Sequence, residues 1–190
     1  MSILRVVIGE AFAELLEAAR GGNDQAFAVL WRDGNYALVR YLRVIVPDAA
    51  EDVAAETWIQ VIRGLPGFRG DELAWRAWLF TTARRRAIDE GRRRARRPTV
   101  PLEDLPAGTG PRSADAADVA LDNLSTEAAI ALVAELPPLQ AEVVLLRVVA
   151  GLDVQTVGRM VGRSPGAVRV IAHRALRRLA ATLGQMGVTL

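Results

Sequence analysis

The feature that most constrains this chain is the spacing of its apolar residues, which recur every three or four positions through most of the sequence. That period places apolar side chains along one face of an α-helix, whereas the alternation typical of a half-buried strand is nearly absent. We therefore expect an all-α protein. Of the 190 residues, 51% are hydrophobic and only 5% aromatic, so the helices should bury mainly aliphatic faces.

One segment interrupts this pattern. Prolines and glycines accumulate between residues 98 and 123, where no apolar period continues: Pro98, Pro101, Pro106, Gly108, Gly110 and Pro111. Such a composition is typical of a solvated linker that buries no core of its own. We therefore predict two small helical domains, residues 10–97 and 124–184, joined by a flexible linker over residues 98–123.

Capping residues predict where the helices of the first domain begin. Asp48 followed by Glu51 has the spacing of a capping box, so we expect Asp48 to be the N-cap of a helix that runs to about Arg63. A longer helix is expected from about Asp71 to Arg94. The glycines and proline of residues 65–70 indicate a loop between these two helices.

The strongest local pattern lies near the C-terminal end. Asp153 is expected to cap a short helix that ends at Gly162, and Ser164 to cap a longer one. Two helices joined by such a tight turn form a helix-turn-helix unit, whose second helix can enter the major groove of DNA. The alternative is an ordinary helical hairpin with a solvated basic face. Helical spacing places one set of side chains toward the first helix: Val168, Ile171, Ala172, Ala175 and Leu179.

The positive charges are clustered although the formal net charge is only +2. Eleven arginines and four acidic residues fall between Arg63 and Arg97, and six arginines and no acid between Arg159 and Arg178. Two basic segments separated by an acidic one suggest two contacts with a polyanion. Trp75, Trp78 and Phe80 lie in the first segment, and aromatic rings beside arginines suit single-stranded DNA. The alternative is that both tryptophans belong to the core.

Four carboxylates open the helix expected after Pro47: Asp48, Glu51, Asp52 and Glu56. They could suggest a metal site, but no second ligand cluster completes one, and a helix N-terminus favours acids through its dipole. The chain has no cysteine, and its single histidine, His173, has no nucleophile and orienting group in the pattern of a catalytic triad. We therefore expect no enzyme activity, no metal and no cofactor.

The first 22 residues contain only a brief apolar run, Ile3 to Ile8, which Arg5 interrupts. A signal peptide has a longer apolar core and a small-residue cleavage site, and a membrane-spanning helix needs about 20 apolar residues. We expect a cytoplasmic protein without membrane insertion of its own.

Two stretches now converge on one family. AAEDVAAETWIQVIRGLPGFRG and the following RAWLFTTARRRAIDEGRRRARR resemble region 2 of the extracytoplasmic-function (ECF) sigma factors, group 4 of the sigma-70 family. LPPLQAEVVLLRVVAGLDVQTVGRMVGRSPGAVRVIAHRALRRL resembles their region 4. The resemblance covers about residues 10–97 and 124–184, in the family's order. It implies a factor that binds core RNA polymerase and directs promoter-specific initiation.

The resemblance also implies roles for particular residues. Binding to the β′ clamp of the polymerase would involve Asp52, Glu56, Trp58 and Gln60. Recognition and melting of the minus-ten element would involve Phe68, Arg69, Trp78, Arg84 and Arg85. The minus-thirty-five element would be read by Ser164, Arg169, Val170, His173, Arg174 and Arg177. The implied partners are core polymerase (β′ clamp and β flap), promoter DNA and an anti-sigma factor, with no small-molecule substrate.

Some positions depart from the family's pattern. Arg85 stands where the family often has asparagine, and Val170 and Ile171 replace polar residues common in its recognition helix, so the promoter sequence stays open. Two other functions are compatible with parts of this pattern. A stand-alone dimeric helix-turn-helix regulator would leave the acidic helix and the Trp/Arg segment unexplained. A metal-dependent nuclease would need the second ligand cluster that the sequence lacks.

Overall fold

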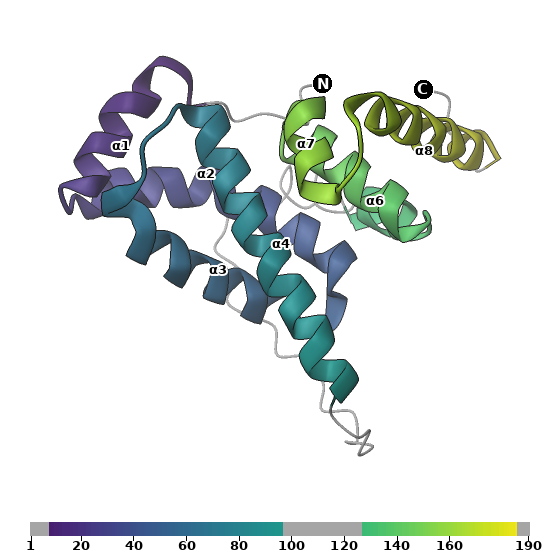
Figure 1. Ribbon diagram of the computed structural model, residues 1–190, viewed down its shortest axis with the longest axis horizontal. Helices are drawn as coiled ribbons and strands as arrows, with labels where there is room; N and C mark the ends of the chain where they lie inside the picture. Colours follow the sequence, from purple (N-terminus) through teal and green to yellow (C-terminus); the bar gives the residue numbers. More distant parts are fainter. Residues whose placement is uncertain (1–7, 97–126, 186–190) are drawn as a thin grey trace, which may run out of the picture.

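The computed structural model describes residues 8–96 and 127–185, and within those ranges the regular structure is helical, without strands (Figure 1). The expected all-α fold is confirmed. Both expected helical domains are present. The predicted linker, residues 98–123, lies outside the described residues.

Four α-helices and three short 3-10 turns form the N-terminal domain. In chain order these are η1 (Gly9–Ala11), α1 (Phe12–Arg20), α2 (Asp24–Ile45), η2 (Pro47–Ala49), α3 (Ala50–Gly64), η3 (Leu65–Gly67) and α4 (Glu72–Arg96). Helix α2 is the centre of the domain, because α1, α3 and α4 all pack against it. Leu30, Leu38 and Leu42 of α2 are fully buried there.

Gly34 allows α2 to cross its neighbours closely. A Cβ at this position would lie 2.8 Å from Leu79 Cδ2 and 3.1 Å from Trp58 Cη2. Both distances are shorter than ordinary van der Waals contact, so a larger residue would push α4 and α3 away. The helix itself continues through this glycine, since packing on both sides compensates for its poor helix propensity.

Most of the predicted caps are confirmed, but Asp48 is not one. Helix α3 begins at Ala50, and its N-cap Ala49 makes no side-chain hydrogen bond. Pro47 instead starts the 3-10 turn η2, which carries Asp48 away from the first N–H groups of α3. The Asp48 carboxylate accepts a hydrogen bond from Arg94 Nη1 at 2.8 Å, and so ties η2 to the end of α4.

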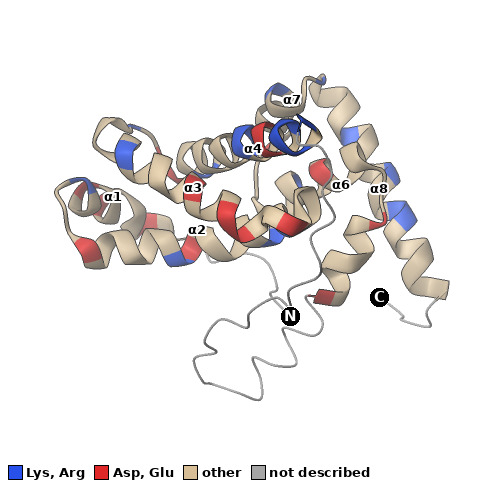
Figure 2. Cartoon of the chain, turned by 90° about the horizontal axis from the view of Figure 1, so that it is seen from below, with Lys and Arg blue, Asp and Glu red and all other residues tan. Residues whose placement is uncertain are grey.

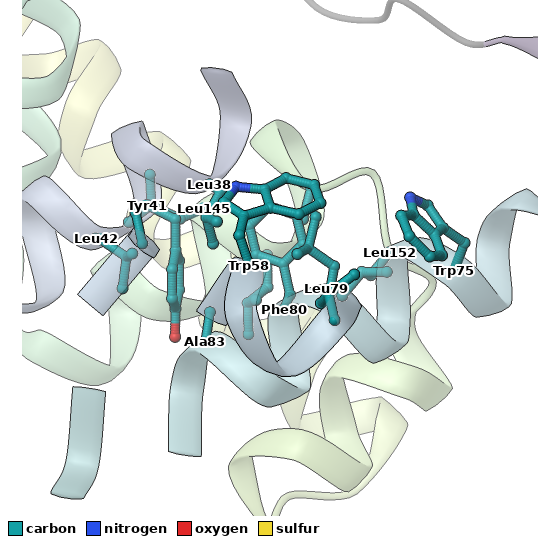
Figure 3. Packing of buried hydrophobic residues seen from close by; sticks show 14 of the residues in the cluster. Leu38, Tyr41, Leu42, Trp58, Trp75, Leu79, Phe80, Ala83, Leu145 and Leu152 are labelled. Atoms are coloured by element: carbon teal, nitrogen blue, oxygen red, sulfur yellow. The ribbon is translucent and has the colours of Figure 1, made fainter. Parts of the chain in front are cut away.

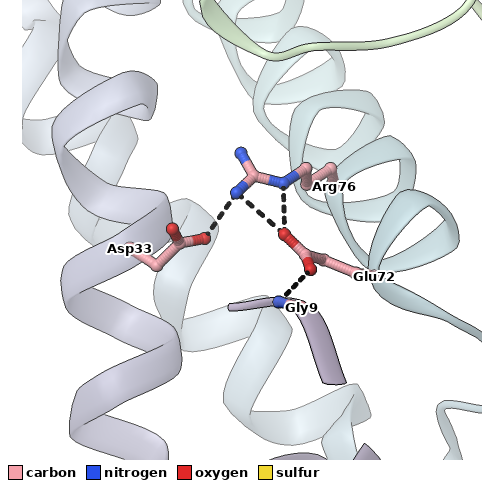
Figure 4. Close-up of polar contacts among 4 residues, drawn as sticks. All are labelled: Gly9, Asp33, Glu72 and Arg76. Carbon is pink, nitrogen blue, oxygen red and sulfur yellow. Dashed lines mark hydrogen bonds and ion pairs between the residues drawn. The ribbon is translucent and has the colours of Figure 1, made fainter. Parts of the chain in front are cut away.

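A partly buried polar network joins η1, α2 and the start of α4 (Figure 4). Arg76 Nη2 of α4 donates to Asp33 Oδ2 of α2 at 2.9 Å and to Glu72 Oε1 at 3.1 Å. Glu72 Oε2 accepts from the backbone N–H of Gly9 at 3.0 Å. Burial raises the pKa of Asp33, while the Arg76 guanidinium opposes that shift. The network fixes η1 and α2 to the start of α4.

The C-terminal domain is built from shorter helices. Residues 127–134 are helical, followed by α6 (Pro138–Val144), the π-helical turn η4 (Leu145–Val149), α7 (Val154–Val161) and α8 (Pro165–Gln185). Helix α6 thus continues into a π turn before Gly151, whose φ is 68°. Helix α6 packs mainly on α8, and α7 packs on α8.

The two domains touch one another directly. Helix α2 lies against α6 and η4, and a single apolar cluster includes residues of both domains. Leu145 and Leu152 of the C-terminal domain belong to the same cluster as Trp58, Trp75 and Phe80 of the N-terminal domain (Figure 3). All but Trp58 are almost fully buried, and Trp58 is 5% exposed. The sequence pattern alone did not predict this contact.

Candidate nucleic-acid interface

Helices α7 and α8 form a helix-turn-helix unit with a tightly constrained turn. Gly162, at the C-cap of α7, has φ 66° and ψ 42°, the left-handed conformation that glycine adopts without strain. Gly158 lies so close to the turn that a Cβ there would be 2.6 Å from the backbone oxygen of Arg163. Ser164 Oγ accepts a hydrogen bond from the N–H of Ala167 at 3.2 Å, as expected for an N-cap.

The cap of α7 is a small hydrogen-bonded network. Asp153 Oδ1 accepts from the Thr156 N–H at 2.8 Å and Oδ2 from the Thr156 hydroxyl at 2.9 Å. Arg159 Nη2 in turn donates to Thr156 Oγ1 at 2.9 Å. The backbone bond from Thr156 contributes most to lowering the pKa of Asp153. These bonds fix the start of the first helix relative to the turn.

One face of α8 is buried and the other is exposed. Val168 and Ala175 face α6 and α7 and are fully buried, with Ile171, Ala172 and Leu179 partly buried beside them. The structure thus confirms the stripe expected from the sequence. The six residues predicted to read the minus-thirty-five element are all exposed: Ser164, Arg169, Val170, His173, Arg174 and Arg177.

Three aromatic rings pack together where the loop before α4 meets the first turns of that helix: Phe68, Trp75 and Trp78. The rings of Phe68 and Trp78 are stacked, with centroids 4.9 Å apart and an interplanar angle of 12°. Trp75 lies edge-on to both rings and is fully buried. Trp75 is therefore a core residue, whereas Phe68 and Trp78 are half-buried at the surface, and contact of these rings with single-stranded DNA stays a prediction.

Two glycines make room for this stack. A Cβ on Gly64 would lie 2.7 Å from Trp78 Cζ2, and a Cβ on Gly70 would lie 3.2 Å from Phe68 Cζ and 2.7 Å from Ala74 Cβ. Gly70 also has φ 152°, which L side chains rarely adopt. The ring positions are therefore fixed by backbone on both sides of the loop.

The arginines predicted for the minus-ten element differ in their surroundings. Arg69 is exposed and folds back, donating from Nη1 to the carbonyl oxygens of Pro66 at 2.9 Å and Phe68 at 2.7 Å. Arg85 is exposed. Arg84 is half-buried, and its Nε donates to Glu142 Oε1 of the C-terminal domain at 2.8 Å. In this conformation Arg84 is therefore engaged with the other domain.

Helix α3 presents the residues predicted to contact polymerase. Asp52 is exposed, Gln60 is half-buried, and Glu56 lies 3.9 Å from Arg86 Nη1 of α4. Trp58 instead points into the core, where its Nε1 donates to Asn35 Oδ1 at 2.8 Å. Trp58 therefore lies on the buried face of α3, 5% exposed, and its expected part in the polymerase contact stays a prediction.

The same helix exposes two apolar side chains that the sequence did not single out. Ile59 is 47% exposed and Ile62 is 51% exposed. Because they stand near Asp52 and Glu56 on α3, the accessible surface of this helix combines acidic and aliphatic groups. Figure 2 shows acidic residues along α3, and basic residues on α4 and α8.

Within residues 8–96 and 127–185, no group of three or more histidine, cysteine or acidic residues is arranged to hold a metal ion. Across those same ranges, none of the helices combines the length and apolar character that crossing a bilayer requires.

Both halves of the chain are similar to known protein families. Residues 35–97 match the family described as Sigma-70 region 2, and residues 126–179 match Sigma-70, region 4. The ECF RNA polymerase sigma factor BldN of Streptomyces coelicolor is 34% identical over 173 residues, which cover 90% of this chain and 65% of that protein. SigD of Mycobacterium tuberculosis, also an ECF RNA polymerase sigma factor, is 33% identical, covering 90% of this chain and 83% of SigD.

Solved structures give the same fold. CnrH, in complex with the cytosolic domain of CnrY, matches with a TM-score of 0.60 at 22% identity, covering 93% of this chain and 99% of CnrH. The sigma factor RpoE of Bartonella quintana, in complex with the anti-sigma factor NepR, matches with a TM-score of 0.57 at 23% identity, covering 83% and 96%. With both regions matched in order and curated relatives above 30% identity, this chain belongs to the ECF RNA polymerase sigma factors of the sigma-70 family.

Proposed function

We propose that this chain binds core RNA polymerase in the cytoplasm and directs it to specific promoters, without catalysis of its own. The observation that carries the proposal is the exposed face of α8, which follows a capped helix-turn-helix and carries arginines over a fully buried apolar stripe. The family membership and the order of the two matched regions support it.

Helix α8 would read the minus-thirty-five element. Arg169 and Arg174 stand at the start and middle of the helix, where arginine can donate two hydrogen bonds to a guanine edge or neutralise a phosphate. His173 and Arg177 extend the same surface, and Ser164 lies at the helix N-terminus, whose free N–H groups favour a phosphate. Val170 adds an exposed apolar contact that suits a thymine methyl group.

The loop before α4 and the first turns of α4 would engage the minus-ten element. Phe68 and Trp78 form a rigid half-exposed aromatic surface, on which an unpaired base can stack. Arg69 and Arg85 are exposed nearby and would bind phosphates of the melted strand. Arg84 would join them only after its bond to Glu142 breaks.

Helix α3 would dock on the β′ clamp through Asp52, Glu56 and Gln60, with Ile59 and Ile62 adding apolar area. Trp58 anchors this helix to the core, where its Nε1 donates a hydrogen bond to Asn35 Oδ1 of α2. The β flap would bind the C-terminal domain, as the family resemblance implies. The proposed domain division is 10–97 and 124–184, with residues 98–123 as the linker between them.

An anti-sigma factor is part of the proposal. RpoE of Bartonella quintana is solved in complex with one, and its fold is similar over most of this chain. A regulator that covers the α3 face or the α8 face would block polymerase or DNA respectively. Each domain alone contacts few phosphates, so its binding to free duplex DNA should be weak and salt-sensitive. When polymerase holds both domains, binding of one domain to DNA raises the effective concentration of the other near its own element, so the promoter is bound more tightly than by either domain alone.

The proposal is tested by separating DNA reading from polymerase binding. Arg169→Ala and Arg174→Ala should each weaken promoter-directed transcription, by about 1–3 kcal/mol where the lost contact reads a base edge, and leave core polymerase binding intact. Asp52→Ala combined with Glu56→Ala should weaken polymerase binding. Arg32→Ala, an exposed arginine on α2, is the charge-matched control. Loss of polymerase binding in the arginine variants, with normal binding in the acidic double variant, would contradict the assigned roles.

A further inference from the structure

Beside the shared apolar cluster, the polar contacts between the two domains are centred on one carboxylate. Glu142 Oε1 of α6 accepts a hydrogen bond from the Tyr41 hydroxyl of α2 at 3.1 Å and from Arg84 Nε of α4 at 2.8 Å. Arg84 Nη2 also approaches Glu142 Oε2 at 3.4 Å. One side chain of the C-terminal domain therefore holds two helices of the N-terminal domain at once.

These groups are largely shielded from water. Tyr41 is fully buried, the Glu142 side chain is 14% exposed and the Arg84 side chain is 27% exposed. Around them, Val44 of α2 packs against the apolar residues that join α6 to α8. A second ion pair across the domains, Arg43 to Glu127 at 3.8 Å, is much more exposed and contributes little. Among the contacts that the structure describes within residues 8–96 and 127–185, the Glu142 group is thus the principal polar link between the domains.

This closed arrangement does not allow the chain to reach both promoter elements. The minus-ten and minus-thirty-five elements are about 25 base pairs apart, which is roughly 85 Å at about 3.4 Å per base pair. A domain of about 60 residues is only about 25–30 Å across. Since Arg84 touches α6, and α6 packs on α8, no part of the C-terminal domain is far enough from α4.

We propose that Glu142 is an intramolecular latch, which keeps the free chain closed and occupies Arg84 until the two domains separate. The closed chain hides a residue assigned to the minus-ten element, and opening both frees Arg84 and lets α8 move to the distant element. The consequence for DNA rests on the proposed function, whereas the closure itself is a property of the chain alone.

The closure is tested in the full-length chain by charge reversal. Because the sequence has no cysteine, Ala13→Cys on α1 and Ala181→Cys on α8, both exposed, provide unique sites for a fluorescent donor and acceptor. Single-molecule energy transfer then reports the distance between the domains. Glu142→Arg places two cations together and Arg84→Glu places two anions together. Each should raise the ratio of open to closed molecules by roughly tenfold or more, given a partly buried pair.

Combining Arg84→Glu with Glu142→Arg restores an ion pair in the opposite sense and should close the chain again. Glu135→Arg and Arg32→Glu make the same charge changes at exposed positions and should leave the distance unchanged. Circular dichroism on every variant shows whether both domains stay helical. An already extended wild-type chain, or single reversals that leave the distance unaltered, would overturn the latch.

A second readout concerns Arg84. Binding of a fluorescent single-stranded oligonucleotide to the free chain should be tighter for Glu142→Arg than for Glu135→Arg, although both add the same charge. Equal affinity of these two variants would overturn the masking of Arg84. If the energy-transfer cycle behaves as expected but the wild-type chain starts no transcription with core polymerase, the latch stands and the proposed function falls.

Discussion

Trp78 is stacked on Phe68, with ring centroids 4.9 Å apart and planes inclined by 12°, and Gly64 is the residue that leaves room for it. The indole is confined because a Cβ on Gly64 would approach its Cζ2 atom to 2.7 Å. The stack is thus a prepared aromatic surface rather than a pair of freely rotating side chains. Its position beside the η3 loop connects the local glycine pattern to the proposed capture of an unpaired base.

Gly64→Ala should displace the Trp78 ring and destabilise the N-terminal domain by about 1–3 kcal/mol, as overpacking does. The sign of the change in unfolding free energy is informative, because replacing a helical glycine by alanine otherwise stabilises a protein by about 0.5–1 kcal/mol. Denaturant unfolding and tryptophan fluorescence measure both effects. Gly67→Ala in the adjacent turn, where a Cβ would meet no atom within 4 Å, is the matched control. A stability gain in Gly64→Ala would show that the ring is not confined.

Tyr41 should ionise only when the domains separate. Burial raises the pKa of Tyr41 well above its usual value, and the facing Glu142 carboxylate adds to the shift, while Arg84 opposes it. A raised folded-state pKa means that this contribution to stability is complete below the unfolded value, near pH 10, and is lost at higher pH. In a Tyr36→Phe background Tyr41 is the only tyrosine, so phenolate absorbance follows it alone. Ionisation of Tyr41 in a chain that stays closed would contradict this account.

Asp153 should stabilise the helix-turn-helix in a pH-dependent way. The backbone bond from Thr156 lowers the pKa of Asp153, so its stabilising contribution is present above the unfolded value, near pH 4, and is lost as the pH falls through the lower folded value. Asp153→Ala should cost about 0.5–2 kcal/mol. Asp153→Asn keeps a capping oxygen and should remove the pH dependence instead. Thermal unfolding between pH 3 and pH 7 separates the two variants.

Arg76 should matter more through the charge it neutralises than through its own contacts. Arg76→Met leaves Asp33 buried beside Glu72, and breaking a buried pair in this way costs about 3–5 kcal/mol. Adding Asp33→Asn removes the isolated charge and should recover part of that loss. Urea unfolding of the two single variants and the double variant gives the coupling. Additive losses would show that the two side chains act independently.

The sequence predicted those features that depend on neighbours within a few residues. Asp153 and Ser164 cap their helices because each accepts a hydrogen bond from an N–H only three positions ahead. Asp48 could not be assigned in this way, since Pro47 redirects it and its partner Arg94 lies 46 residues further on. The distinction between an accessible and a buried aromatic ring likewise depended on tertiary packing.

The candidate site shows the same limit. The division of α8 into a buried and an exposed face follows from helical period, and Val168 lies on the inner side as expected. The burial of Trp58 and the engagement of Arg84 by Glu142 arise from contacts between elements 23 and 58 residues apart. Periodicity cannot distinguish an exposed apolar residue such as Ile62 from a core residue, because both satisfy the same spacing.

The most direct measurement of the central claim is run-off transcription with the purified full-length chain, core RNA polymerase and genomic DNA fragments, followed by mapping of the RNA start sites. The account predicts that the chain binds core enzyme and that the pair initiates at a defined set of start sites sharing two upstream elements, an initiation that Arg169→Ala weakens. Initiation with the same start sites in the absence of the chain, or no association with core enzyme, would contradict it.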